Sequence, residues 1–182
     1  INTAFNLIEK NGWNSFRLQN LAEEIGVDVM EVKSVFKTKI KLIEAFSEMI
    51  DEKIISSIDL QEFEENTTKD NLFELIMLRF EMLKPYKKSL VILLKDLSEK
   101  PSILQKVVKK IMSSMDLFLE LSKAKKNYLL DFVKINILFF LYTHIFRIWL
   151  SDNSSDMTIT MAELDKWLSN LEKYSGKFNL SF

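Results

Sequence analysis

Apolar residues recur at three- and four-residue intervals along most of the chain, which is the spacing of one helical face. In the first 46 residues this pattern predicts four short helices. Gly12 would end the first helix as a left-handed cap, and Gly26 would end the second. Asp28 and Thr38 would begin the third and fourth as N-caps. Two short helices joined by a glycine turn, after a helix that packs against them, form a helix-turn-helix pattern. The apolar faces of the four helices consist of Ala4, Phe5, Leu7 and Ile8; Leu18, Leu21, Ala22 and Ile25; Val29, Val32 and Phe36; and Leu42, Ile43, Phe46 and Ile50.

A polar stretch at 59–70, DLQEFEENTTKD, follows and predicts an acidic loop. Beyond it the helical spacing returns in longer segments, and no useful length of sequence alternates apolar and polar residues as a strand would. Thr158 or Thr160 would cap the last helix. The chain is therefore predicted to be all-α, with a helix-turn-helix unit at 1–46 and a larger helical domain at 47–182. The expected long helices are 71–84, 86–98, 101–122, 127–150 and 159–174.

The composition disfavours most enzyme chemistry. The 182 residues include 25 Lys and Arg against 26 Asp and Glu, a net charge of −1. Three widely separated glycines cannot form the glycine-rich loops that cradle phosphates. The absence of cysteine excludes thiolate sites, and the single histidine, His144, disfavours a His-based metal site or a Ser-His-Asp triad. We therefore expect a protein that is not an enzyme and that has neither cofactor nor metal.

The most apolar window is 131–150, DFVKINILFFLYTHIFRIWL, which is about long enough to cross a bilayer. Lys134, His144 and Arg147 interrupt it, so the pattern favours a core or dimer-interface helix over a membrane span. No secretory signal precedes the first helix, and because the chain starts at Ile1 we expect an N-terminal piece to be missing. The expected location is the cytoplasm, with at most peripheral membrane contact.

A set of residues in the first unit has the spacing of a known DNA-binding module. These residues are Ala4-Phe5, Gly12-Trp13, Leu18, Leu21-Ala22, Gly26-Val27, Phe36, Lys39 and Leu42. The pattern resembles the DNA-binding end of TetR-family regulators. This resemblance implies a TetR-like fold, whose first unit binds DNA and whose second unit binds a small hydrophobic ligand and dimerises. The DNA contacts would be Arg17, Lys33, Lys37 and Lys39.

The charges of this unit are less favourable to DNA than the resemblance implies. Basic and acidic residues balance over 1–46, and Asp28 and Glu31 stand at the start of the third helix, where they stabilise its dipole but repel phosphates. Lys33 and Val35 occupy positions at which TetR-family regulators usually carry Tyr or His. We therefore expect a weakened DNA-binding surface.

The same resemblance implies a homodimer. TetR-like proteins dimerise through their last two long helices, which form a four-helix bundle with those of a second copy. Burial of these side chains within one chain is the alternative. The residues predicted for the interface are Ile137, Leu141, Ile145, Leu164, Trp167, Leu168 and Leu171.

A second pattern covers nearly the whole chain. It comprises Gly12-Trp13, Leu42–Phe46, Asp51–Lys53, Arg79–Tyr86, Tyr142 and the run W-L-x-D-x-S-x-D-x-x-x-T-x-x-x-L-D from Trp149 to Asp165. These residues resemble the ubiquinone-biosynthesis accessory family, whose members have a TetR-like fold and bind lipid. The resemblance implies a protein that extracts an isoprenoid lipid or quinone precursor from a bilayer and presents it to a hydroxylase of that pathway.

Large apolar residues of the second domain are the candidates for the ligand pocket, because Met and Phe line adaptable cavities. An ordinary helical core is the alternative for these residues, and a hydrogen-bonded core or interface histidine is the alternative for His144. We favour the lipid-binding function, with a ligand-controlled TetR-family regulator as the alternative. The predicted pocket consists of Phe73, Met77, Phe80, Met112, Met115, Phe118, Phe139, Tyr142, His144 and Phe146.

Overall fold

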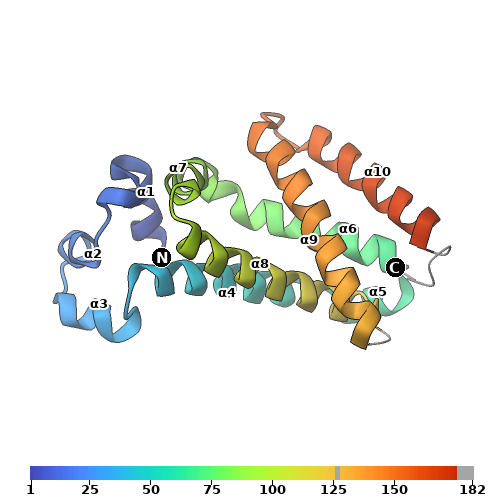
Figure 1. The fold of residues 1–182 in the computed structure, drawn as a ribbon, viewed down its shortest axis with the longest axis horizontal. Coiled ribbons are helices and arrows are strands. Elements are labelled where there is room, and N and C mark those ends of the chain that lie inside the picture. The colour runs from blue at the N-terminus through green and yellow to red at the C-terminus, as the bar shows by residue number, and fades with distance from the viewer. Residues whose placement is uncertain (126–127, 176–182) are drawn as a thin grey trace. The chain divides into compact units, whose positions relative to one another are not determined.

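The computed structural model describes residues 1–125 and 128–175, and every regular element in these ranges is helical (Figure 1). The predicted all-α class is confirmed, and most predicted helix boundaries lie within a few residues of the observed ones. The elements are α1 (Asn2–Ser15), α2 (Leu18–Ile25), α3 (Val29–Val35), α4 (Lys39–Ser57), α5 (Leu60–Glu65), α6 (Thr68–Leu83), the 3₁₀ turn η1 (Lys84–Tyr86), α7 (Lys87–Ser98), α8 (Pro101–Leu121), α9 (Tyr128–Ser151) and α10 (Thr158–Ser175).

The helices form two compact units, each built from two separate segments of the chain. Unit 1 comprises Ile1–Ile50 and Leu83–Lys110, and unit 2 comprises Asp51–Met82 with the described residues from Ile111 onward. Helices α4 and α8 therefore each contribute residues to both units. The predicted first domain, 1–46, falls inside the first segment of unit 1, and α7 joins it from later in the chain.

Aromatic packing forms the core of unit 1. The ring centroids of Phe5 and Phe46 lie 4.0 Å apart, and Tyr86 meets both rings edge-on at 5.3 and 4.9 Å. The Tyr86 hydroxyl donates a hydrogen bond to Asn2 Oδ1 at 2.6 Å. Because Phe5 belongs to α1, Phe46 to α4 and Tyr86 to η1, this cluster joins the two segments of the unit.

Gly12 kinks α1 instead of ending it. Its φ of 77° is positive as expected, but its ψ of 157° lies outside the left-handed helical region, and helical residues resume up to Ser15. The prediction of a left-handed cap at Gly12 is therefore wrong. A side chain here would be strained by this backbone, which only glycine adopts readily, and its Cβ would lie 3.3 Å from Asp96 Oδ2.

The predicted acidic loop at 59–70 contains a short helix, so that prediction is wrong in part. Asp59 caps α5 by accepting a hydrogen bond from the backbone N–H of Gln61 at 2.9 Å. Phe63 anchors the helix because its side chain is buried, and its carbonyl accepts a hydrogen bond from Asn71 Nδ2 at 2.8 Å. Over residues 61–67, Phe63 is buried and the other side chains are exposed.

Helix α9 packs against α10 in unit 2 (Figure 1). Its inner residues, which include Leu138, Ile145 and Trp149, are buried, so this part of the apolar window forms core. Among the described residues, one helical stretch, Leu130–Ser151, is long enough and apolar enough to cross a membrane. A core helix passes the same test, so the result carries little weight for membrane contact, which stays a prediction.

Candidate functional site

Helices α2 and α3 form the predicted helix-turn-helix. Gly26 follows α2 with φ 71° and ψ 34°, a left-handed cap, and open space surrounds the position of its missing Cβ. The backbone N–H of Val27 donates to the Ala22 carbonyl at 3.1 Å, which closes the turn. Asp28 then caps α3, because its carboxylate accepts from the Met30 N–H at 2.6 Å. Both predicted local signals, the glycine and the cap, are confirmed.

Helix α3 presents one buried and two exposed faces. Val32 is 5% exposed and packs inward. Met30, Lys33 and Ser34 are exposed and follow the i, i+3, i+4 spacing of a single helical face, which we call the outer face of α3. Val35 is also exposed, but it lies five residues after Met30 and therefore points in a different direction.

Val35 lines a separate apolar groove of about 230 Å³ in unit 1. The groove lies between the start of α1, the end of α2 and the side of α3 that carries Glu31. Sequence analysis did not predict it, because its walls come from three helices that the spacing of apolar residues cannot bring together. It is lined by Ile1, Thr3, Leu21, Ile25, Val27, Glu31, Val32, Val35 and Phe36.

Lys39 is half-buried and makes contacts within unit 1, and its assignment as a DNA contact stays a prediction. Its ammonium group donates hydrogen bonds to the carbonyls of Trp13 and Phe16 at 2.8 and 3.2 Å and lies 4.4 Å from the centre of the Trp13 ring. Burial, together with the positive charges of Arg17 and Lys100, lowers the pKa of Lys39. These contacts hold the ammonium group against the C-terminal end of α1.

The other predicted DNA contacts are exposed. Lys33 belongs to the outer face of α3, and Lys37 follows α3 in the turn before α4. The Arg17 side chain is also exposed, but its Nη1 donates to the carbonyls of Asn14 and Phe16 at 2.6 and 3.0 Å. Lys33 and Lys37 are therefore the predicted cations whose placement best suits contact with phosphates.

The predicted ligand pocket divides into buried and surface residues. Phe80, Met115, Phe118 and Tyr142 are buried in the core of unit 2, and Phe146 packs against Phe80 and Tyr142 with ring centroids 6.3 and 5.8 Å apart. Phe73, Met77, Met112 and Phe139 are half-buried, whereas His144 is exposed and meets the Trp167 ring edge-on at 5.0 Å. His144 thus belongs to the surface of the α9–α10 pair.

Two of the predicted pocket residues, Phe73 and Met77, line an open groove of about 410 Å³ along α6. Acidic side chains stand beside them, and burial together with the charge of Glu62 raises the pKa of Glu74. The groove is wide enough for a small organic molecule, but the structure does not join it to the buried aromatic residues. Its lining is Asp70, Phe73, Glu74, Met77, Leu78 and Glu81.

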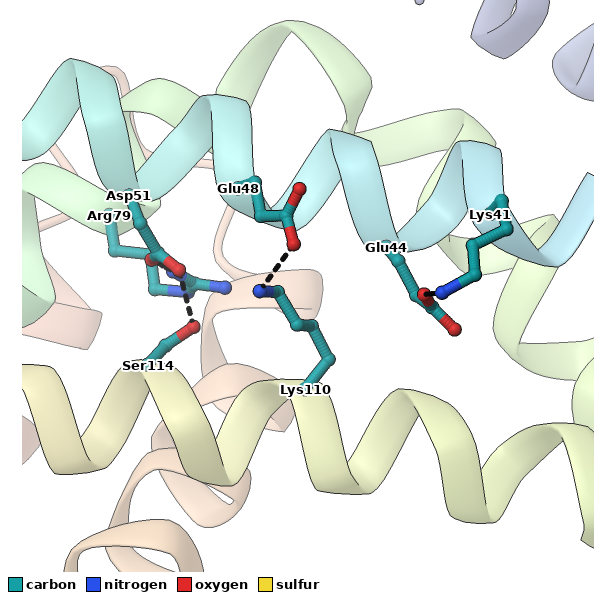
Figure 2. A network of polar contacts seen from close by, with 7 residues as sticks. All are labelled: Lys41, Glu44, Glu48, Asp51, Arg79, Lys110 and Ser114. Carbon is teal, nitrogen blue, oxygen red and sulfur yellow. Dashed lines mark hydrogen bonds and ion pairs between the residues drawn. The ribbon is translucent and has the colours of Figure 1, made fainter. Parts of the chain in front are cut away.

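A buried ion pair, which sequence analysis missed, crosses the core of unit 2. Figure 2 shows Asp51 of α4 between Arg79 of α6 and Ser114 of α8. Arg79 forms an ion pair with Asp51 and donates from Nε to the Tyr142 hydroxyl at 3.2 Å, and Ser114 donates to Asp51 at 2.7 Å. Burial raises the pKa of Tyr142. Arg79 was the sequence signal for this ion pair, because it follows Leu75 by four residues and so places a charge on the apolar face of α6.

The monomer buries four of the residues predicted for the dimer interface. Leu141, Ile145, Leu164 and Leu168 are at most 5% exposed within the chain, so unit 2 buries them without a second copy. Ile137 and Leu171 are half-buried, and Trp167 is 43% exposed. Other apolar residues on these two helices are exposed instead: Phe132, Val133, Phe140, Ile159, Met161 and Tyr174.

The run from Trp149 to Asp165 forms the turn between α9 and α10. Asp152 is buried; one of its oxygens accepts from the N–H and hydroxyl of Ser154, and the other accepts from those of Thr160. Burial by itself raises the pKa of this carboxyl, but these four hydrogen bonds outweigh it and hold the pKa well below its ordinary value. The conspicuous polar residues of this motif therefore have a structural role as a cap.

Comparison with known proteins supports the fold and goes no further. No family model and no curated protein matches the chain. Among solved structures, the chain is similar to a TetR transcriptional regulator from Nitrosomonas europaea ATCC 19718, with a TM-score of 0.77, 20% identity and coverage of 92% of each chain. The resemblance to the ubiquinone-biosynthesis family stays a prediction. At this level of identity the similarity establishes one conclusion, that the chain has an all-α, TetR-like fold.

Proposed function

We propose that this protein is a transcriptional regulator that binds DNA through α3. The observation that carries the proposal is the intact helix-turn-helix: a left-handed turn at Gly26, a capped α3, and an outer face that leaves Lys33 and Ser34 exposed. In this motif the second helix enters the major groove, and its exposed residues meet bases and phosphates. The structural neighbour is described as a TetR regulator, which agrees with this function.

The working form in this proposal is a homodimer. Exposed apolar residues on α9 and α10, including Phe140 and Trp167, supply a surface that a second copy would cover. Two copies of α3 would then contact two half-sites. A small hydrophobic ligand in unit 2 would control the affinity for DNA, and the groove along α6 is one position for it.

DNA binding can be tested by fluorescence anisotropy with a labelled pool of random duplexes, titrated at salt concentrations from about 50 to about 200 mM. Arg17, Lys33 and Lys37 of two protomers give six phosphate contacts, which predict a slope of about −5 for log K against log salt, at roughly 0.9 per contact. The double variant Lys33→Ala, Lys37→Ala removes four of them and should reduce the slope to about −2.

The matched control is the double variant Lys95→Ala, Lys106→Ala. It removes the same charge from exposed positions on α7 and α8, outside the helix-turn-helix. Circular dichroism establishes that both variants fold. The proposal fails if the wild-type protein does not bind DNA at the lowest salt concentration, or if both double variants lower the slope equally.

A further inference from the structure

The outer face of α3 has an apolar centre. Met30 is 67% exposed, although it stands beside the exposed polar residues Lys33 and Ser34 on a helix that faces solvent. Its backbone N–H is already held by Asp28, so the position of Met30 in the first turn of α3 is fixed. A long thioether side chain exposed at a fixed position can make apolar contacts with a partner.

We infer that Met30 reads the 5-methyl group of thymine in the major groove of DNA; this inference rests on the proposed DNA-binding function. The N-terminal residues of the second helix of this motif are those that contact base edges, and Met30 is the second residue of α3. Of the four bases, thymine alone presents an apolar group in the major groove. The contact therefore favours half-sites that contain thymine opposite Met30.

The charge around Met30 supports base contact over phosphate contact. Asp28 and Glu31 lie on either side of it in sequence and are both exposed, so they disfavour a close approach of the phosphate backbone at the start of α3. Lys33, one turn later on the same face, is the nearest cation of the outer face. The selectivity of α3 then depends on apolar contact more than on the count of positive charges.

Val35 provides a matched control. It is 70% exposed, about as much as Met30, but it faces the groove that Ile25 and Val27 also line. The variants Met30→Ala and Val35→Ala both truncate an exposed apolar side chain of α3. Met and Ala are both good helix formers, so Met30→Ala leaves the stability of α3 nearly unchanged.

The experiment begins with selection of duplexes from a random library by the wild-type protein. Each thymine of the selected duplexes is then replaced by uracil, which keeps the hydrogen-bonding edge and removes only the methyl group. We expect the selected duplexes to be enriched in thymine. Uracil at one position of each half-site should weaken binding by about fourfold for each methyl group removed. Met30→Ala should bind the thymine and uracil duplexes equally, whereas Val35→Ala should still discriminate.

The outcomes separate this inference from the function on which it rests. If the wild-type protein retains no duplex even at low salt, the proposed function fails and the inference fails with it. If the protein selects duplexes but uracil makes no difference, or Met30→Ala still discriminates, the inference is overturned while DNA binding stands. Equal loss of discrimination in Met30→Ala and Val35→Ala also overturns the assignment to Met30.

Discussion

Asp152 concentrates four hydrogen bonds on one buried carboxylate. The donors belong to Ser154, in the turn, and to Thr160, in the first turns of α10. Hydrogen bonds to a charged acceptor are stronger than those between neutral groups, so this side chain fixes the angle at which the chain leaves α9 and begins α10. The Asp152 carboxylate should therefore contribute strongly to the free energy of unfolding, through contacts confined to this turn.

We predict that Asp152→Asn lowers the free energy of unfolding by about 2–3 kcal/mol, because an amide cannot accept all four hydrogen bonds. Urea unfolding followed by circular dichroism measures this change. Asp156→Asn, in the same turn but exposed, is the control and should lower the free energy of unfolding by less than Asp152→Asn does. Equal losses in the two variants would contradict the role of Asp152 as the buried cap.

The same carboxylate makes stability depend on pH in a defined direction. Folding lowers the pKa of Asp152 below its ordinary value of 3.8. The unfolded chain therefore binds a proton at a higher pH than the folded protein does, and the free energy of unfolding decreases as the pH falls below about 4. The Asp152→Asn variant should show a shallower decrease over this interval, measured by unfolding at a series of pH values.

Lys39, the first residue of α4, holds together the backbone at the end of α1. We predict that Lys39→Met lowers the free energy of unfolding by about 1–3 kcal/mol, because the carbonyls of Trp13 and Phe16 lose their donor. Lys37→Met, an exposed neighbour, should leave stability within about 0.5 kcal/mol of the wild type. Thermal unfolding of the two variants compares them directly, and a stable Lys39→Met variant would contradict this role.

At the scale of the helices, local signals predicted the fold well where one residue decides the structure. Gly26 and Asp28 mark the end of α2 and the start of α3 by their own backbone preferences, so the sequence suffices there. Gly12 was harder, because glycine adopts several conformations with positive φ and the neighbouring residues do not select among them. Helix α5 was missed because the burial of Phe63, and not any periodic pattern, stabilises it.

The candidate sites were harder to predict than the helices. Apolar spacing identifies the face of α9 that is buried, but it cannot tell whether α10 of the same chain or a second copy covers that face. Leu141 and Ile145 were therefore assigned to the dimer interface although the monomer buries them. Exposed Phe140 lies on another side of the same helix. Asn136, His144 and Arg147 share that side at helical spacing, and these polar residues were the available signal that this side is not core.

At the scale of the whole molecule, the proposed dimer depends on this exposed surface. We predict that Phe140→Asp, which puts a charge on α9 where the side chain is 69% exposed, converts the protein from dimer to monomer. Light scattering after size-exclusion chromatography gives the mass. Val91→Asp changes an exposed residue of α7 in the same way and should leave the dimer intact. A wild-type protein that elutes as a monomer would contradict the dimer itself.

The buried pair of Asp51 and Arg79 has a consequence for how unit 2 avoids incorrect packing. Apolar helices alone can slide past one another by a turn, about 5.4 Å, and still bury similar surface. Such a slip would separate Arg79 from Asp51 and from Tyr142 and leave an arginine, which cannot lose its charge, without a partner inside the core. The pair thus penalises a shifted alignment of α4, α6 and α9. The apolar side chains of this core are therefore held in the register that keeps Arg79 beside Asp51 and Tyr142.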